Sequence, residues 1–440
     1  MEKLLAPRVG AARILAQVER GDSLAKQLPH ALTKVKPEQR ALAQELVYGT
    51  LREWPRLQGL ADQLLAKPLR AKDGDVKALV LMGIHELTAM RTPDHATVAE
   101  TVAATRLLGK PWAAGLVNGC LRNYQRRQEA LESHLNDWQK QALPEWLWQA
   151  LQRQWPGHLD QIARSQRNRP PLTLRVNQQR TTSQDYLALL RESGIKAQAV
   201  APLATAITLD KPCPVEELPG FSSGLCSVQD AAAQLAAPLL ALKGGEQVLD
   251  ACAAPGGKAS HLLEQAGAAT LIAADISEER LQRVEENLQR LGLRAEMRIL
   301  DAATASTTLS GAEFPAILVD APCSATGVMR RNPDIKIHRQ PEDVAHFAAQ
   351  QASILEGLWP LLVTAGRLLY VTCSILREEN DQVIEAFLQN NGDAQVMAIT
   401  EAFGEATEYG LQTLPEETGA DGLYYALLTK RAHQPKPVMR

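Results

Sequence analysis

Four apolar stretches in the second half of the chain each end in an aspartate. EQVLD ends in Asp250, TLIAAD in Asp275, AEMRILD in Asp301 and FPAILVD in Asp320. Segments with helical periodicity, such as KASHLLEQ and EERLQRVEENLQRLG, separate the first three. Strands that alternate with helices form a parallel sheet covered by helices on both faces. We therefore expect residues 231–432 to form a Rossmann-like, doubly wound α/β domain.

These aspartates should meet at one edge of the sheet, where the carboxyl ends of parallel strands form a ligand-binding crevice. A single aspartate there is most simply a helix cap or a turn residue. Four in succession indicate a binding site. Negative charges repel phosphates but suit an adenosine that carries a cation, as in S-adenosylmethionine. Asp275, at the end of the second strand, is placed to bind ribose hydroxyls.

The turn after Asp250 reads ACAAPGGKASHLLE. Gly256 and Gly257 let the backbone approach a ligand closely and expose amide groups at the start of a helix. The turn lacks the GxGxxG pattern, and Ala259 follows Lys258 where a phosphate-binding loop needs serine or threonine. The pattern therefore disfavours a dinucleotide or a nucleoside triphosphate.

Two of the six cysteines, Cys323 in DAPCSATG and Cys373 in YVTCS, directly follow strands at this edge. The cysteines contain no CxxC pair, so we expect no metal site and no redox dithiol. Cys120, Cys213 and Cys226 are interpreted as small hydrophobic residues.

A thiolate at the sheet edge can act as a nucleophile. Its addition to carbon 6 of cytosine would activate carbon 5 for methylation. Asp320 would stabilise charge on the ring, and a second thiol would assist release of the product. This chemistry leaves open which of the two cysteines attacks.

Four motifs resemble the RNA cytosine-C5 methyltransferases of the Fmu/Sun/NOL1/NOP2 type. They are DACAAPGGKASHLLE, AADISEERLQRVEENLQRLG, LVDAPCSATGVMRRNPDIK and LYVTCSILREEN. The N-terminal segments ARILAQVERGDSL, QELVYGTLR and ETVAATRLLGKPWAAGLVNGCLR resemble the RNA-binding NusB domain. The combination implies small-subunit (16S) ribosomal RNA as the substrate.

The resemblance also implies the roles of individual residues. Cys373 is expected to be the nucleophile, Cys323 to help resolve the covalent adduct, and Asp320 to activate the base. Arg330 and Arg331 are expected to bind RNA. The expected S-adenosylmethionine contacts are Cys252, Ala253, Ala254, Pro255, Gly256, Gly257, Lys258, Asp275, Asp301 and Asp320.

Three further regions complete the expected organisation. Residues 1–140 form the NusB-like helical domain, 141–230 a linker helix with a small α+β RNA-binding module, and 433–440 a tail. The first 140 residues contain 21 basic and 15 acidic residues, an excess that permits phosphate contacts.

The chain has no signal-peptide pattern and no apolar run of membrane-spanning length, so a cytoplasmic protein without membrane contacts is expected. We also expect the protein to be a monomer. Two alternatives remain: a transfer-RNA cytosine-C5 methyltransferase, and a noncatalytic NusB-like RNA-binding or antitermination factor. A cysteine hydrolase is disfavoured because the motifs that carry Cys323 and Cys373 contain no histidine to serve as its base.

Overall fold

The computed structural model describes residues 4–266, 269–400, 403–416 and 419–432. The chain forms two compact units: Met1–Arg169 with Met329–Pro341, and Pro170–Val328 with Glu342–Arg440. The expected small module thus belongs to the same unit as the methyltransferase-like sheet, whereas the linker helices belong to the helical unit. The predicted tail at 433–440 lies outside the described residues.

The first unit is built from helices, as its three- and four-residue apolar spacing predicts. The central helix α5 is buried over most of its length and packs against α1, α3, α4, α6 and α7. Aliphatic side chains from each of these helices form the hydrophobic core of the helical unit. The helices are α1 (Pro7–Glu19), α2 (Leu24–Thr33), α3 (Arg40–Arg52), α4 (Trp54–Leu64), α5 (Gly74–Ala89), α6 (Asp94–Leu107), α7 (Ala114–Ser133), α8 (Asp137–Lys140), α9 (Glu145–Gln154) and α10 (Leu159–Ser165).

A later segment, Met329–Pro341, completes this helical unit. It contains the short helix α16 (Ile335–His338). The ammonium of Lys336 is buried and donates hydrogen bonds to the carbonyl oxygens of Arg52 (2.6 Å) and Ala142 (2.9 Å). The chain therefore leaves the second unit directly after the turn that carries Cys323 and returns to it at Glu342.

A four-stranded antiparallel sheet begins the second unit, in the order β2-β3-β1-β4. Helix α11 (Ser183–Glu192) packs against it, and Tyr186 is fully buried in the shared core. On strand β1, Arg175 is fully buried and forms two hydrogen bonds with Glu264 of α13 (Gly257–Gln265), at 2.8 and 2.7 Å. The strands are β1 (Leu172–Val176), β2 (Ala197–Ala199), β3 (Ala206–Leu209) and β4 (Cys226–Val228).

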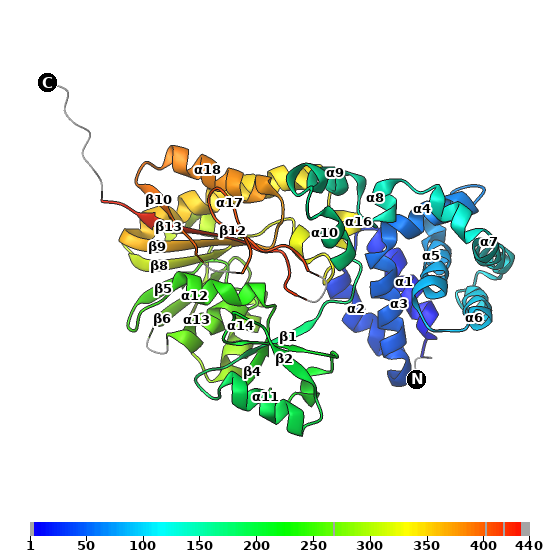
Figure 1. Ribbon diagram of the computed structural model, residues 1–440, viewed down its shortest axis with the longest axis horizontal. Coiled ribbons are helices and arrows are strands. Elements are labelled where there is room, and N and C mark those ends of the chain that lie inside the picture. The colour runs from blue at the N-terminus through cyan, green and yellow to red at the C-terminus, as the bar shows by residue number, and fades with distance from the viewer. Residues whose placement is uncertain (1–3, 267–268, 401–402, 417–418, 433–440) are drawn as a thin grey trace. The chain divides into compact units, whose positions relative to one another are not determined.

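The large sheet has the order β11-β12-β13-β9-β8-β5-β6-β7, and β10 pairs with β13 (Figure 1). The five strands from β9 to β7 are parallel, and the pairings that involve β10, β11, β12 and β13 are antiparallel. The strands are β5 (Gln247–Asp250), β6 (Thr270–Asp275), β7 (Glu296–Ile299), β8 (Phe314–Asp320), β9 (Leu362–Thr372), β10 (Ala394–Met397), β11 (Glu405–Ala406), β12 (Leu411–Gln412) and β13 (Tyr424–Lys430).

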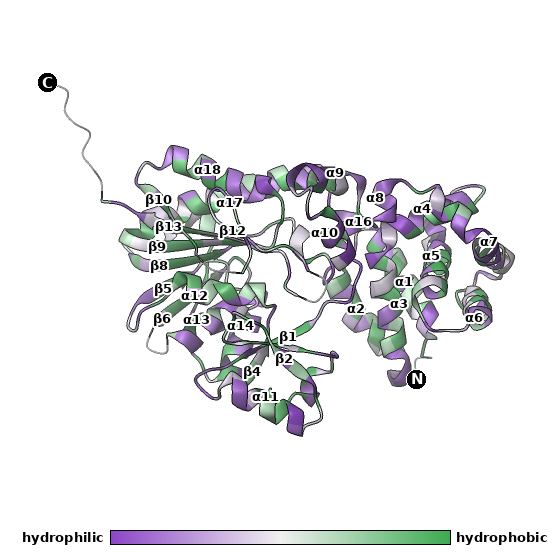
Figure 2. Ribbon diagram, viewed as in Figure 1, coloured by the Kyte–Doolittle hydropathy of each residue, from purple (hydrophilic) through white to green (hydrophobic). Residues whose placement is uncertain are grey.

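Helices cover both faces of this sheet. Alternate residues of β8 point to opposite sides, so Ala316 and Leu318 join one core while Ile317 and Val319 join the other. The first core includes α12 (Ala236–Leu240), α13 and α14 (Glu278–Leu291), and the second includes α17 (Pro341–Leu358) and α18 (Asp381–Asn390). Hydrophobic residues colour these central strands green in Figure 2.

The expected doubly wound α/β fold is confirmed for the parallel strands. Each of the expected strands in this region forms close to its expected position. The antiparallel extension, with β13 paired to β9, was not expected. The strands of this extension are short or are single apolar runs, and the sequence of such a run does not indicate whether the strand pairs in a parallel or an antiparallel direction.

No helix in the described part of the chain is long and apolar enough to cross a membrane.

Candidate active site

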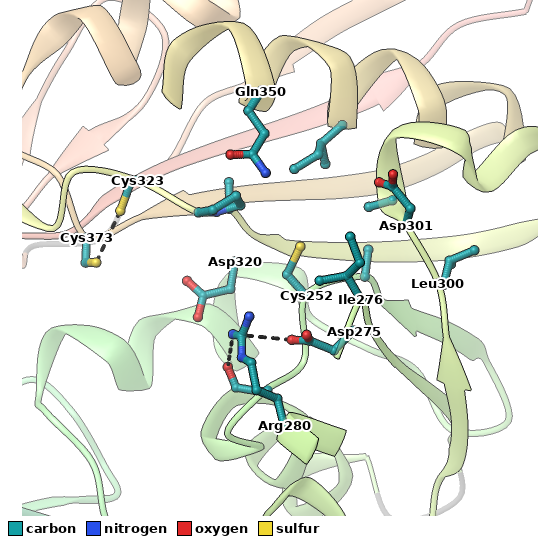
Figure 3. A pocket seen from close by; sticks show the side chains of 16 residues that line it. Cys252, Asp275, Ile276, Arg280, Leu300, Asp301, Asp320, Cys323, Gln350 and Cys373 are labelled. Atoms are coloured by element: carbon teal, nitrogen blue, oxygen red, sulfur yellow. Dashed lines mark hydrogen bonds and ion pairs between the residues drawn. The ribbon is translucent and has the colours of Figure 1, made fainter. Parts of the chain in front are cut away.

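A cavity of about 270 Å³ lies at the carboxyl ends of the parallel strands. Its lining residues follow strands β5, β6, β7, β8 and β9, and helix α17 adds Gln350 and Ile354 (Figure 3). The strand order reverses between β5 and β8, because β6 and β7 lie on one side of β5 and β8 on the other. Parallel α/β sheets bind ligands at such a reversal, so the cavity lies at the expected ligand edge.

The glycine-rich turn after β5 contributes Cys252 and Ala254 to the cavity. Gly256 adopts φ +97°, and a Cβ atom there would lie 3.2 Å from Cα and Cγ1 of Val284 on α14. Glycine is therefore required for the turn to pack against this helix. The other predicted cofactor residues of the turn are not among the lining residues described: Ala253, Pro255, Gly256, Gly257 and Lys258.

Asp275 and Asp301 line the cavity in different environments. Asp275 is buried; its Oδ1 accepts a hydrogen bond from the Ser277 amide at 3.1 Å. Its Oδ2 lies 3.3 Å from the Arg280 guanidinium but lacks a partner with hydrogen-bond geometry. Asp301 is exposed, and its Oδ1 accepts from the Ala303 amide at 3.0 Å, as a helix cap does.

Asp320 ends β8 and lines the same cavity. Its Oδ2 accepts a hydrogen bond from the ammonium of Lys258 at 2.6 Å. Burial, the largest single cause, lowers the pKa of Lys258, but the charge of Asp320 and the hydrogen bond to it, with smaller contributions from Cys373 and Asp250, together raise the pKa above its usual value. Lys258 therefore stays cationic, and its charge lies beside the carboxylate expected to contact the base.

Asp250 ends β5 and is fully enclosed, outside the group of lining residues. Burial, and next the charge of Asp320, raise its pKa to about 8. At neutral pH this carboxyl is thus largely protonated. Of the four strand-end aspartates, Asp250 is the one that does not line the cavity.

The two thiols expected to act together are brought into contact. The Sγ atoms of Cys323 and Cys373 are 3.2 Å apart, and both residues line the cavity (Figure 3). The hydrogen bond to Cys373 and then burial raise the pKa of Cys323 well above its usual range. Cys323 therefore keeps its proton at neutral pH.

Of the other cysteines, Cys252 lines the cavity, whereas Cys120 and Cys226 are not among its lining residues. Burial raises the pKa of Cys120 and of Cys226, and the sulfur of Cys226 lies 2.9 Å from the Tyr186 hydroxyl. Burial also raises the pKa of Cys252 far above its usual range, so this lining thiol stays protonated. The described residues contain no group of His, Cys, Asp or Glu side chains able to hold a metal ion.

Arg330 and Arg331 belong to the segment that completes the helical unit. The Arg330 side chain is fully buried, and its carbonyl oxygen accepts a hydrogen bond from Arg52 at 3.0 Å. Arg331 is partly buried. Contact between these arginines and RNA remains a prediction, and for Arg330 it would require the side chain to move.

Three family models match successive parts of the chain. They are described as the NusB family (residues 5–126), the Methyltr_RsmF/B-like ferredoxin-like domain (143–216) and the 16S rRNA methyltransferase RsmB/F (237–429). The protein of Pseudomonas syringae pv. tomato named ribosomal RNA small subunit methyltransferase B is 46% identical over 437 residues, covering 97% of this chain and 98% of the relative. The chain belongs to the ribosomal RNA small subunit methyltransferase B family.

Other members and structures agree with this family. A Pseudomonas putida protein of the same name is 47% identical, over 97% of this chain and 99% of the relative. A crystal structure of a methyltransferase homolog protein from Pyrococcus horikoshii matches with a TM-score of 0.59 and 26% identity, over 67% of this chain and 97% of that chain. The resemblance expected from the motifs is confirmed, and the protein is a methyltransferase.

Several residues around the family's site were not anticipated. Ile276, which directly follows Asp275, and Arg280, five residues after Asp275, line the cavity. The position of Ile276 next to a strand-end aspartate was the usable signal in the sequence. Glu379 is buried behind the two cysteines and contacts both of their turns. LREEN contains acids typical of a surface helix, so the sequence offered no signal that this one is buried.

Proposed function

We propose that this enzyme methylates carbon 5 of one cytosine in small-subunit ribosomal RNA, with S-adenosylmethionine as methyl donor and Cys373 as covalent nucleophile. The observation that carries the proposal is the 3.2 Å contact between the Cys323 and Cys373 sulfurs beside Asp320 in one cavity. The ribosomal target rests on the family and on the names of its members.

The cavity residues fit S-adenosylmethionine. Asp275 presents a buried carboxylate oxygen without a hydrogen-bond partner, which suits a ribose hydroxyl. Ile276, which is 66% exposed, offers an apolar surface for an adenine ring. The carboxylates of Asp301 and Asp320 add negative charge that favours a cationic ligand. When bound, the cofactor supplies an electrophilic methyl group.

Cys373 is the better nucleophile of the two thiols because the raised pKa of Cys323 keeps that second thiol protonated. The Cys373 sulfur forms a bond to carbon 6 of the cytosine, and the electron pair of the 5,6 double bond moves toward carbon 5. Asp320 stabilises the negative charge that develops on the pyrimidine ring by donating a proton to it, and the Lys258 ammonium, 2.6 Å from Asp320 Oδ2, can supply that proton. These residues thus prepare carbon 5 to accept a methyl group.

Product release requires loss of the proton on carbon 5 and cleavage of the bond between sulfur and carbon 6. Once Cys373 is bonded to carbon its sulfur is a thioether, a weaker hydrogen-bond acceptor, so the contact that raises the pKa of Cys323 most is weakened. Cys323 can then lose its own proton to solvent and take the proton from carbon 5. The electron pair left behind restores the double bond, and Cys373 departs as a thiolate.

Bisulfite mapping tests this function directly. Ribosomal and transfer RNA would be compared between cells that lack the gene and cells that carry it on a plasmid. We expect one cytosine of small-subunit ribosomal RNA to lose its 5-methyl group in the deletion strain and to regain it on complementation. A change confined to transfer RNA would support the alternative substrate, and no change in either RNA would contradict the proposal.

A further inference from the structure

Glu379 lies behind the two cysteines, in the short 3-10 helix Arg377–Glu379 that follows β9. Its side chain is fully buried. One carboxylate oxygen, Oε2, accepts hydrogen bonds from the hydroxyls of Ser324 (2.5 Å) and Ser374 (2.6 Å). Each serine directly follows one of the two cysteines in the chain. A single oxygen atom thus joins the two turns that carry the thiols.

The other carboxylate oxygen ties the Cys323 turn more firmly. Glu379 Oε1 accepts from the Ser324 amide at 2.7 Å and from the side-chain amide of Gln351 at 3.3 Å. The same Gln351 nitrogen donates to the carbonyl oxygen of Pro322 at 2.9 Å. Hydrogen bonds therefore connect Glu379 to the residues on both sides of Cys323, directly to Ser324 and through Gln351 to Pro322.

The carboxylate itself is fixed in place. The Tyr370 hydroxyl donates to the Glu379 carbonyl oxygen at 2.7 Å, which anchors the backbone below the side chain. Four hydrogen bonds, all from neutral donors, reach the two carboxylate oxygens. An ionised carboxylate can only accept, so it orients every hydroxyl and amide around it in one direction. Burial raises the pKa of Glu379, while Ser324 and Ser374 oppose that rise.

We propose that Glu379 is a positioning residue that holds the Cys323 and Cys373 turns together so that their sulfur atoms meet at the substrate. This inference rests on the proposed function, since the spacing matters for catalysis only if both thiols act. Buried carboxylates are costly unless every oxygen is hydrogen-bonded, and here the compensating donors come from the two catalytic turns. The charge also disfavours ionisation of Cys323, which agrees with the proton lying on that thiol.

The spacing can be measured without RNA. Mild oxidation with diamide of the purified full-length protein should convert the wild-type pair rapidly into a disulfide, detected by mass spectrometry of the peptide pair. In Glu379→Ala we expect the rate of disulfide formation to fall at least about tenfold, because the turns are no longer joined. Glu378→Gln, at the neighbouring and partly exposed position, serves as the matched control and should keep the wild-type rate.

Steady-state kinetics with ribosomal RNA gives the second measurement. We expect kcat of Glu379→Ala to fall about tenfold to a hundredfold, with KM for RNA and for S-adenosylmethionine within about threefold of wild type. Glu379→Gln has the same shape and keeps one oxygen, so it should retain more of both rates. It also keeps the test decisive if the alanine variant does not fold.

The outcomes separate the two proposals. Wild-type disulfide formation and wild-type kcat in both Glu379 variants would overturn the positioning role, even if Cys373 is essential. A slow disulfide in the Glu379 variants together with full activity of Cys373→Ala would leave the positioning intact and overturn the proposed function. Equal loss in Glu378→Gln would also contradict a specific role for Glu379.

Discussion

The sulfur atoms of Cys323 and Cys373 lie 3.2 Å apart although 50 positions separate the two residues in the chain. Cys323 follows β8 and Cys373 follows β9, and these neighbouring strands are parallel. Their carboxyl ends therefore bring both thiols to one edge of the sheet. A backbone hydrogen bond from the Gly327 amide to the Cys373 carbonyl oxygen, at 2.9 Å, also links the turns.

Replacement of Cys373 by alanine should abolish methyl transfer while leaving cofactor binding intact. The variant loses the thiolate expected to attack carbon 6, so we expect kcat to fall by at least about a thousandfold. Transfer of tritium from labelled S-adenosylmethionine to RNA measures activity, and calorimetry measures cofactor affinity. Turnover at the wild-type rate would remove Cys373 from the mechanism.

Asp275 and Asp301 form a matched pair for testing the cofactor site. In Asp275→Asn the side chain can still accept from the Ser277 amide, but it loses the charge that faces the cavity. We expect S-adenosylmethionine affinity to fall roughly tenfold to a hundredfold, since a hydrogen bond to a charged group contributes about 1.5–3 kcal/mol.

Asp301→Asn is the comparison for that measurement, because Asp301 lines the same cavity but its charge is exposed to solvent and therefore acts more weakly on a bound ligand. Asp301 is exposed and already caps the following helix, and asparagine caps equally well. We expect its affinity to change by less than about threefold. The opposite ranking of the two variants in calorimetry would show that the ribose site lies elsewhere in the cavity.

The buried Lys336 should make the stability of the protein depend on pH. Burial lowers the pKa of its ammonium to about 7. Between that value and the pKa of about 10.4 in the unfolded chain, the unfolded state binds more protons, so stability should rise with pH. This gain in stability is absent below the pKa of Lys336 in the folded protein and is complete above its pKa in the unfolded chain.

Lys336→Met should lack this rise. Urea unfolding of the full chain, followed by circular dichroism at about pH 7.5 and 9.5, measures the difference between wild type and variant. We expect the destabilisation caused by the substitution to grow with pH, by up to about 1.4 kcal/mol per pH unit. A difference that stays constant across this range would show that Lys336 is fully charged in the folded protein.

Sequence patterns predicted the parallel half of the large sheet well because β5, β6 and β8 are apolar runs bounded by turns and helices. Pairing of β13 with β9 was not predictable in the same way, because neither direction nor register is encoded in a short apolar run. The order of the strands was enough to predict that the two cysteines lie at the same edge of the sheet. Their contact depends on turns whose shape is set by tertiary hydrogen bonds.

Side chains whose surroundings come from distant segments were the least predictable. Glu379 is buried with donors that Ser324 and Gln351 supply from two distant parts of the chain and Ser374 supplies from five residues earlier. Arg330 is one of two consecutive arginines, a pattern typical of a surface, yet its side chain is buried. In both cases the residue type indicated exposure, and packing decided otherwise.

The covalent adduct is the most direct test of the mechanism. Cys323→Ala should attack cytosine normally through Cys373 but release the product slowly, because the second thiol is missing. Incubated with ribosomal RNA and S-adenosylmethionine, then denatured, it should give a stable protein–RNA complex whose nucleotide-bearing peptide contains Cys373, and Cys323→Ala/Cys373→Ala should give none. Rapid turnover of Cys323→Ala without an adduct, or an adduct at another residue, would contradict the account.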